Sequence, residues 1–320
     1  MVRQNHYPMS MTWDSFPVAM ATELLEDLWH NQSVWSQTAD RMKNGIARTR
    51  LAALYIVVAV AVCGTLSGAV ANPQPAMSRV LAAAAAFGAA SLPLLRPRWS
   101  GRALQDWTRA RSVSEALKSE IYLHLGRVGR YGDDPDGALL RTRTDRVRQD
   151  GNDLLEHQLG IKAAQRDLPA VQDIASYFSV RVTGQIDGYY TVKARELRTR
   201  IRLFRGIETV LAVIGAALGA IAAAVGGGSV APWIAVVTTL GTAVGVHVAA
   251  TRYDYQLIEF LRTADRLDQL RSQAAAPGVT PRKLNWLARS AEQVISIQNE
   301  GWMAKLAQEP PNYNTNGGTK

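Results

Sequence analysis

One titratable side chain, His247, lies within a long apolar stretch between Val230 and Thr251. Thr238 and Thr242 precede it and share one helical face with Gly245. An ionisable group among apolar residues is a candidate for proton or ion transfer, and a threonine face can border water. However, threonine also hydrogen-bonds its own helix backbone, and His247 lies within two turns of the end of the stretch. The sequence leaves both roles open for three candidate pore-lining residues: Thr238, Thr242 and His247.

Catalytic chemistry has no comparable signal. The sequence contains no Walker A loop and no HExxH, GxSxG or CxxC motif. Its single cysteine, Cys63, lies in an apolar run, where neither a disulfide within the chain nor a zinc site can form. We therefore expect no catalytic residues, no metal site, no cofactor and no enzymatic activity.

The apolar stretches have the length of membrane spans. A hydrocarbon core of about 30 Å needs roughly 20 residues of α-helix. Uncharged runs of this length cover about 51–71, 207–225 and 230–251. A fourth, about 77–95, is shorter unless it starts near Ala76 with Arg79 directed towards the headgroups. The sequence predicts an all-α membrane protein with four transmembrane helices in two hairpins, each extended by long cytoplasmic helices.

Charge beside these runs predicts their orientation. The net charge is +9, and arginines cluster next to the apolar runs, at 195–205 and at Arg252 for the second hairpin and at 96–102 for the first. Lys and Arg mark the cytoplasmic side, so both termini should be cytoplasmic in a multi-pass protein of the cell membrane. Anionic lipid headgroups account for the excess charge, and we expect no nucleic-acid partner.

Small residues recur four apart within the runs. Three pairs have this spacing: Gly64 and Gly68, Gly215 and Gly219, and Gly241 and Gly245. Such pairs allow helix backbones to approach closely. The six glycines are candidate helix-packing residues, either within one chain or between subunits.

The two hairpins resemble copies of one unit. Trp35, Ala39, Met42, Ile46 and Arg50 align with Tyr190, Ala194, Leu197, Ile201 and Arg205 at a constant offset. Chance similarity between amphipathic helices is the alternative explanation. We expect an N-terminal tail (1–22), a first membrane unit (23–131), a linker and connector helix (132–168), a second membrane unit with C-terminal cytoplasmic helices (169–306) and a disordered tail (307–320).

Proline positions predict where helices continue. No proline falls between Trp233 and Ala276, which favours a last membrane helix that runs unbroken into the cytoplasm. Pro93 and Pro97 should kink or break the corresponding helix of the first unit. Pro281 to Ala307 has the spacing of an amphipathic helix with Leu284, Leu287 and Ala291 on its inner face.

The order of these features resembles a known family. An aromatic and basic helix precedes each hairpin, and a carboxylate, Glu115, follows the first. The second half contains the remaining residues of the pattern: Leu168, Pro169, Tyr177, Arg181, Gln185, Tyr190, Glu292 and Trp302. This pattern resembles the SLATT family of prokaryotic two-helix membrane effector domains, here in tandem over Glu23 to Leu306. The resemblance implies an association with nucleotide-signalling conflict systems and a pore-forming effector role.

Two functions follow as hypotheses. The first is an oligomeric inner-membrane channel or pore-forming effector, gated from the cytoplasm in a bacterial antiviral or conflict response. Four helices are few for a pore in one chain, so this function requires a homo-oligomer. The alternative is a non-conducting scaffold that recruits a cytoplasmic partner. The expected partners are the lipid bilayer, further copies of the chain, and a cytoplasmic signalling protein or nucleotide signal.

Overall fold

The computed structural model describes residues 16–95, 97, 101–225, 228 and 230–307. Within these residues every regular element is a helix. Four helices are long and apolar enough to cross a membrane: Ala21–Ala69, Pro75–Leu95, Ile174–Val225 and Ala231–Ala274. The predicted fold class, an all-α membrane protein with four spans, is confirmed. The predicted tails and the glycine-rich tip of the second hairpin fall largely outside the described residues.

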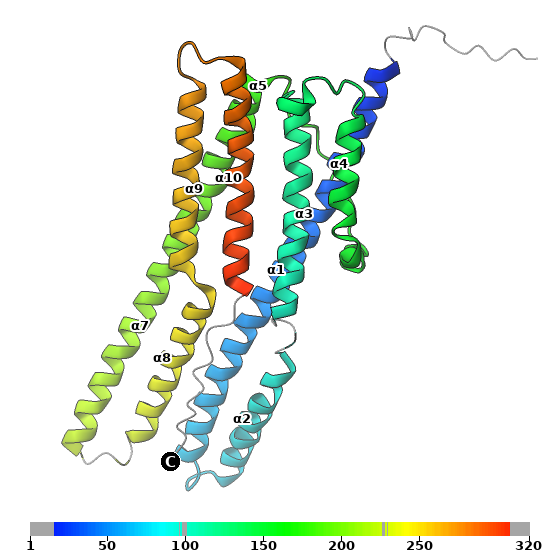
Figure 1. Cartoon of the computed structure of the whole chain (residues 1–320). Helices are drawn as coiled ribbons and strands as arrows, with labels where there is room; N and C mark the ends of the chain where they lie inside the picture. Colours follow the sequence, from blue (N-terminus) through cyan, green and yellow to red (C-terminus); the bar gives the residue numbers. More distant parts are fainter. Residues whose placement is uncertain (1–15, 96, 98–100, 226–227, 229, 308–320) are drawn as a thin grey trace, which may run out of the picture. The chain divides into compact units, whose positions relative to one another are not determined.

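Two long helices each lead into a hairpin (Figure 1). The first, α1, is a single helix over Phe16–Ala69, and it is followed by α2 (Pro75–Leu95). The second ascends from Ile174 through α7 (Thr191–Val225) and is followed by α8 (Ala231–Thr251). The start of α2 at Pro75 gives this helix 21 residues, enough for the span that the sequence left short.

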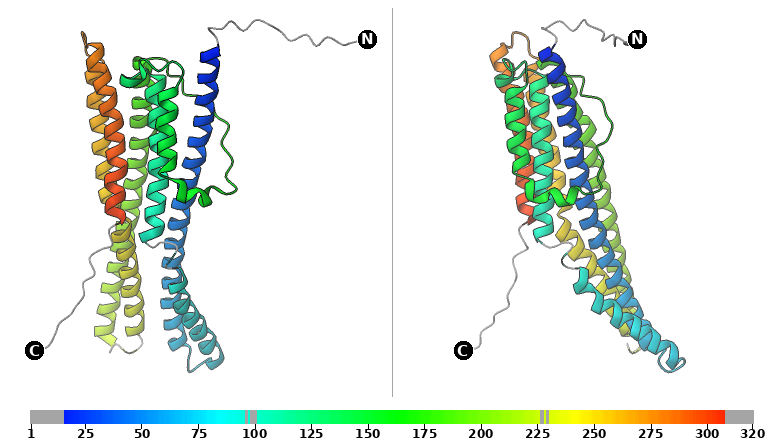
Figure 2. Two further views of the ribbon diagram at one scale, coloured as in Figure 1. Left: turned by 45° about the vertical axis from the view of Figure 1, so that its right-hand side comes forward. Right: turned by 90° about the vertical axis from the view of Figure 1, so that its right-hand side faces the viewer.

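Each hairpin is followed by a pair of helices. After α2 come α3 (Gly101–Leu125) and α4 (Ala138–Gln149), and after α8 come α9 (Tyr253–Ala274) and α10 (Pro281–Ala307). The views agree that α9 and α10 lie side by side (Figure 2). The helix predicted over Pro281 to Ala307 is confirmed, with Leu287, Ala288 and Ala291 fully buried.

The second helix of each hairpin ends before the next helix begins. For the second hairpin this corrects the prediction of a last membrane helix that runs unbroken into the cytoplasm. Arg252 has φ 49° and ψ 42°, a left-handed conformation that ends α8 before α9 begins at Tyr253. Because a residue in the left-handed conformation can end a helix without any proline, the absence of proline did not ensure a continuous helix. In the first hairpin Pro93 remains inside α2, which ends at Leu95, two residues before Pro97.

The second long helix contains wide turns. The segments Tyr177–Val182 and Ile186–Tyr190 are π-helical, and α5 (Ile174–Ser176) and α6 (Thr183–Gln185) flank the first of them. Wide turns of this kind are frequent at functional sites. The first of them contains Tyr177 and Arg181, two residues of the pattern that resembles the SLATT family, and Gln185 ends α6 directly before the second.

Contacts divide the chain into two compact units. The bundle unit comprises Met1–Ala39, Arg109–Gly188 and Asp265–Asn299, and the hairpin unit comprises Asp40–Thr108, Tyr189–Ala264 and Glu300–Lys320. The bundle unit has a conventional apolar core of side chains at most 2% exposed, including Leu28, Trp35, Leu117, Ile121, Tyr177, Leu267 and Leu287.

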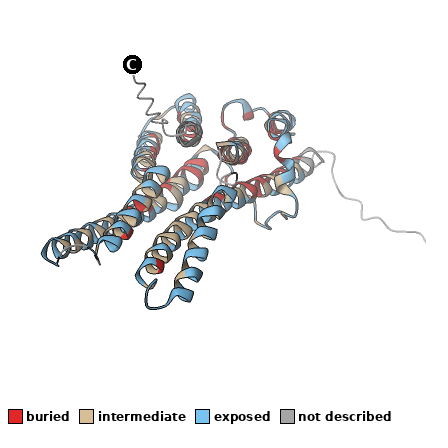
Figure 3. Cartoon of the chain, turned by 90° about the horizontal axis from the view of Figure 1, so that it is seen from below, coloured by how far each residue is buried: buried red, intermediate tan, exposed pale blue. Residues whose placement is uncertain are grey.

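The hairpin unit is far less buried (Figure 3). No residue of α2 is buried, and α8 buries only Val236 and Val244. Phe87 of α2 is 80% exposed. In water this surface would be unfavourable, but in a bilayer it faces hydrocarbon at little cost.

Burial also supports the internal repeat. In the first copy Trp35, Ala39 and Ile46 are buried. The aligned residues of the second copy, Tyr190, Ala194 and Ile201, are buried as well, whereas Leu197 is buried and its counterpart Met42 is half-buried. The long helix that leads into each hairpin thus buries the corresponding face, as expected for two copies of one unit.

Candidate functional site

The predicted membrane site lies in an open groove of the hairpin unit. Thr238 and Thr242 line a cavity of about 500 Å³ together with Val57 of α1 and three further residues of α8: Ala235, Thr239 and Ala243. The structure therefore brings both candidate threonines to one surface. His247 lies beside them in the sequence but not in this cavity, and its ring lies 5.3 Å from that of Phe204.

Hydrogen bonds limit what the threonines present to this groove. Thr238 donates to the carbonyl of Ile234 at 2.9 Å, and Thr242 donates to that of Thr238 at 2.9 Å. Thr239 donates to Ala235 in the same way, at 2.8 Å. Each hydroxyl is thus satisfied by its own helix, the alternative that the sequence left open.

Of the predicted packing glycines, one lies against another helix of the chain. A methyl group added at Gly215 would lie 3.6 Å from Val237, whereas the other five have nothing within 4 Å: Gly64, Gly68, Gly219, Gly241 and Gly245. The sequence missed Gly88, where a methyl group would come within 2.7 Å of Val60. It also missed a clasp between α1 and α2, in which the hydroxyls of Ser67 and Ser78 each donate to the other's carbonyl at 2.9 Å.

The bundle unit contains a second candidate site, a buried ion pair. Arg181 donates to Glu292 through Nε and Nη2, at 2.9 and 3.0 Å. Both side chains are almost inaccessible, at 1% and 6% exposure. The hydroxyl of Tyr177 donates to the same carboxylate at 3.0 Å, and the Arg181 guanidinium lies 4.8 Å from the ring centre of Tyr122. These contacts satisfy most of what burial of two charges requires.

Further charges surround this pair. Glu115 forms an ion pair with Arg111 at 2.7 Å on the same helix. Burial raises the pKa of Glu115, but the charges of Arg111, Lys118 and Arg181 together hold it below its usual range. Burial, and then the charge of Arg181, lower the pKa of Lys118 to about 8. The burial of Tyr177 and the negative charge of Glu292 raise the pKa of its hydroxyl.

Three residues of the pattern that resembles the SLATT family therefore meet in space. Tyr177, Arg181 and Glu292 form one hydrogen-bonded cluster, and Arg181 is close enough to affect the pKa of Glu115. Tyr190 is buried in the hairpin unit against Phe260, with ring centres 5.9 Å apart. Gln185 is half-buried, and the side chain of Trp302 lies outside the described residues.

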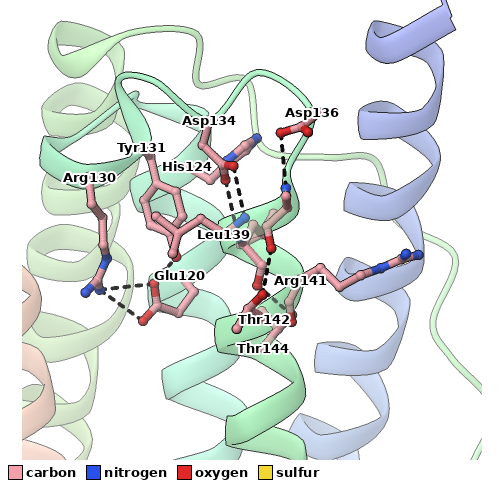
Figure 4. Close-up of polar contacts among 12 residues, drawn as sticks. Glu120, His124, Arg130, Tyr131, Asp134, Asp136, Leu139, Arg141, Thr142 and Thr144 are labelled. Atoms are coloured by element: carbon pink, nitrogen blue, oxygen red, sulfur yellow. Dashed lines mark hydrogen bonds and ion pairs between the residues drawn. The ribbon is translucent and has the colours of Figure 1, made fainter.

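A polar cluster at the end of α3 positions α4 (Figure 4). Asp134 accepts from the backbone N–H groups of Leu139 and Leu140 at 3.0 and 3.1 Å, which caps the first turn of α4. His124 approaches the same carboxylate at 3.5 Å, and burial lowers its pKa. Glu120 accepts from both Arg130 and Tyr131. Sequence reasoning did not predict this cluster, because its members come from a helix, a turn and a loop.

An extended segment is fastened to α1. Trp29, Ser33 and Gln37 are spaced one helical turn apart, and each hydrogen-bonds the backbone of the segment 161–170. The partners are the carbonyl of Asp167, the N–H of Ala164 and the carbonyl of Lys162, all at 2.9 Å. The Arg166 guanidinium stacks 3.7 Å from the ring centre of Trp29. We call residues 161–170 the strap.

No metal centre emerges from these clusters. Among the described residues, no group of three or more His, Cys, Asp or Glu side chains could hold a metal ion. Cys63 is a free thiol in α1.

These observations define a multi-pass membrane protein with two helical hairpins and a helical bundle that contains a buried ion pair. Residues 177–302 match the family described as SMODS and SLOG-associating 2TM effector domain 1. Residues 177–302 are therefore similar to the SLATT family, which is described as a two-helix (2TM) membrane effector domain. Tyr177, Arg181 and Glu292 all lie in the matched region.

The first hairpin matches a different family. Residues 33–137 match a protein of unknown function, DUF4231. No curated protein and no solved structure matches the chain significantly. The two matches each cover one hairpin, which is what a tandem arrangement requires, although the two halves match separate descriptions.

Proposed function

We propose that the protein is a membrane effector that forms an oligomeric channel or pore, opened by a signal acting on its cytoplasmic helices. The observation that carries this proposal is the open threonine-lined groove of the hairpin unit. The groove lies between α1 and α8, and neither helix closes it within one chain. Further copies of the chain would complete such a surface into a closed path.

The surface of the spans supports self-association. At five of the six predicted packing glycines an added methyl group would have no neighbour within 4 Å: Gly64, Gly68, Gly219, Gly241 and Gly245. A glycine face allows close approach of a second helix, and such faces are typical of helix contacts in membranes. We infer a homo-oligomer with cyclic symmetry, in a bacterial conflict or antiviral response.

Single-channel recording from purified protein in planar bilayers tests the proposal. Discrete conductance steps are expected from the wild-type protein, and a change in conductance or selectivity is expected from the double variant Thr238→Val and Thr242→Val. The matched control is Thr209→Val, on α7 outside the groove. The hydroxyl of Thr209 also donates to its own helix, to the carbonyl of Arg205 at 2.9 Å. If the groove variant conducts like the control, the lining assignment is wrong.

A non-conducting scaffold is the second candidate. The hydroxyls of Thr238, Thr239 and Thr242 all donate to their own helix, so none of these three hydroxyl protons is left for water or an ion in the groove. A scaffold that recruits a cytoplasmic partner would need no polar path through the membrane. Absence of conductance steps from an oligomeric preparation, together with retention of a partner, would favour the scaffold. A strictly monomeric particle in nanodiscs would count against the channel.

We also propose the boundaries of the domains and, from the distribution of arginines beside the spans, the orientation of the chain in the membrane. The tandem units are 23–131 and 169–306, joined by a linker and connector at 132–168, with tails at 1–22 and 307–320. Both termini face the cytoplasm. Reporter fusions after Arg3, within 132–137 and after Lys320 should report the cytoplasm, whereas a fusion at Gly227 should report the outside. A linker found outside would contradict both the orientation and the tandem arrangement.

A further inference from the structure

The bundle unit contains a second cavity, with one polar wall and apolar walls at Leu123 and Val128. It has a volume of about 480 Å³, and its polar walls come from α3, from the turn after α3 and from α10. Six polar side chains line it: Ser119, Arg130, Arg289, Glu292, Gln293 and Ser296. Sites for small molecules usually have volumes of about 300–1,000 Å³, so this cavity can hold more than a water cluster.

The polar wall of the cavity is rich in hydrogen-bond donors. Two guanidiniums, an amide and two hydroxyls face a single carboxylate, Glu292. That carboxylate already accepts two bonds from Arg181 and one from Tyr177, so its negative charge is compensated by these donors. At the polar wall a ligand therefore meets the positive charge of Arg130 and Arg289 together with further hydrogen-bond donors.

Arg289 is the guanidinium most available to a ligand. Its Nε makes only a long bond, 3.4 Å, to the carbonyl of Asn285 on its own helix. Among the described residues, no carboxylate lies within ion-pair distance of it, whereas Arg130 is shared with Glu120 at 3.1 and 3.2 Å. A planar fork of donors binds phosphate or carboxylate with two parallel bonds.

The turn that brings Arg130 to the cavity is fixed in place. Gly129 has φ 61°, a conformation that favours glycine, and its N–H donates to the side chain of Asn285. The Arg289 side chain passes directly over Gly129, where a methyl group would lie 3.5 Å from its Cδ. The arginines of the turn and of α10 are thus held at one cavity before any ligand arrives, which lowers the entropic cost of binding.

We infer that this cavity is a binding site for a small molecule that carries a phosphate or carboxylate group, with Arg289 and Arg130 as its charged contacts. Glu292 belongs both to the cavity and to the buried pair with Arg181. A bound oxyanion draws α10 and the turn after α3 together next to that pair. The link from this site to opening rests on the proposed channel function, whereas binding itself does not.

Binding to the full chain in nanodiscs of zwitterionic lipid tests the inference. The probes are sodium pyrophosphate and sodium succinate, titrated by calorimetry, and a parallel set of discs contains an anionic phospholipid. Saturable binding of one soluble probe is expected, with its Kd raised about 10- to 100-fold in Arg289→Gln, since one charge-assisted bond is lost. A rise in thermal midpoint that depends on Arg289 and occurs only in anionic discs would assign a lipid headgroup instead.

Two further variants keep the test decisive. Arg282→Gln removes the same charge two helical turns earlier on α10, outside the cavity, and should bind like the wild type. Arg289→Lys keeps the charge and should retain part of the affinity if Gln alone unfolds the unit. Equal responses of wild type, Arg289→Gln and Arg282→Gln to every probe and lipid would overturn the site. Binding without any conductance would instead refute the channel and leave the site intact.

Discussion

Arg181 and Glu292 lie 111 residues apart in the sequence and form a two-point ion pair at 2.9 and 3.0 Å in the bundle unit. The pair joins the π-helical segment at Tyr177–Val182 to α10. Because both side chains are buried, neither charge can be compensated by water if its partner is lost. This contact connects the start and the end of the region that matches the SLATT family.

Breaking this pair should strongly destabilise the bundle unit. Glu292→Gln leaves the Arg181 charge buried, and we expect a loss of about 3–5 kcal/mol in the free energy of unfolding. Replacing both residues by methionine removes both charges and should cost much less than the single change. Chemical denaturation in detergent measures both. Asp254→Asn is the control, because its ion pair with Arg205 is exposed and should contribute at most about 1 kcal/mol. Equal effects of the two single variants would refute the argument.

Lys118 should make stability depend on pH. Burial and the charge of Arg181 lower its pKa from 10.5 to about 8 in the folded chain. Below pH 8 the lysine is charged in both states and its burial destabilises the fold. Between pH 8 and 10.5 only the unfolded chain keeps the proton, so this destabilisation disappears as pH rises.

Replacing this lysine by methionine tests the pH dependence. Lys118→Met should therefore be more stable than the wild type at pH 7, and the difference should shrink between pH 8 and 10.5. The difference in thermal midpoint between the two proteins, measured across this range, isolates Lys118 from other groups that titrate. A difference that does not change with pH would contradict the lowered pKa.

The strap should be released by removal of its side-chain contacts. The double variant Ser33→Ala and Gln37→Ala deletes the bonds to Ala164 and Lys162, each worth about 1 kcal/mol. Trypsin should then cleave after Lys162 faster than in the wild type, since an extended segment is cut when it detaches. Trp286→Phe, an exposed change on α10, should leave the rate unchanged. Protection equal to the wild type would show that the strap is held by other contacts.

The variant Arg252→Gly should be more stable than the wild-type protein. The left-handed conformation of Arg252 is unfavourable for a residue with a Cβ atom, and relief of this strain should contribute about 1 kcal/mol. Arg252→Val should have the opposite effect, because a β-branched side chain tolerates positive φ poorly. Thermal midpoints of the two variants give the order. If valine and glycine are equivalent, the helix does not break at this residue in solution.

The sequence alone determined the membrane part of this protein. Length, charge and apolar composition act locally, so the four spans could be located without any contact information. The bounds of α10 followed from local signals of the same kind. The residues of the family pattern could also be named, but not what they do.

Tertiary structure decided what those residues touch. The pairing of Arg181 with Glu292, the cavity at Arg289 and the strap on α1 all join segments more than 100 residues apart. No periodicity in the sequence encodes such partners, because each depends on how several helices pack. The break at Arg252 was missed for a related reason. Arginine has no local preference for a left-handed conformation, and packing of the flanking helices has to impose it.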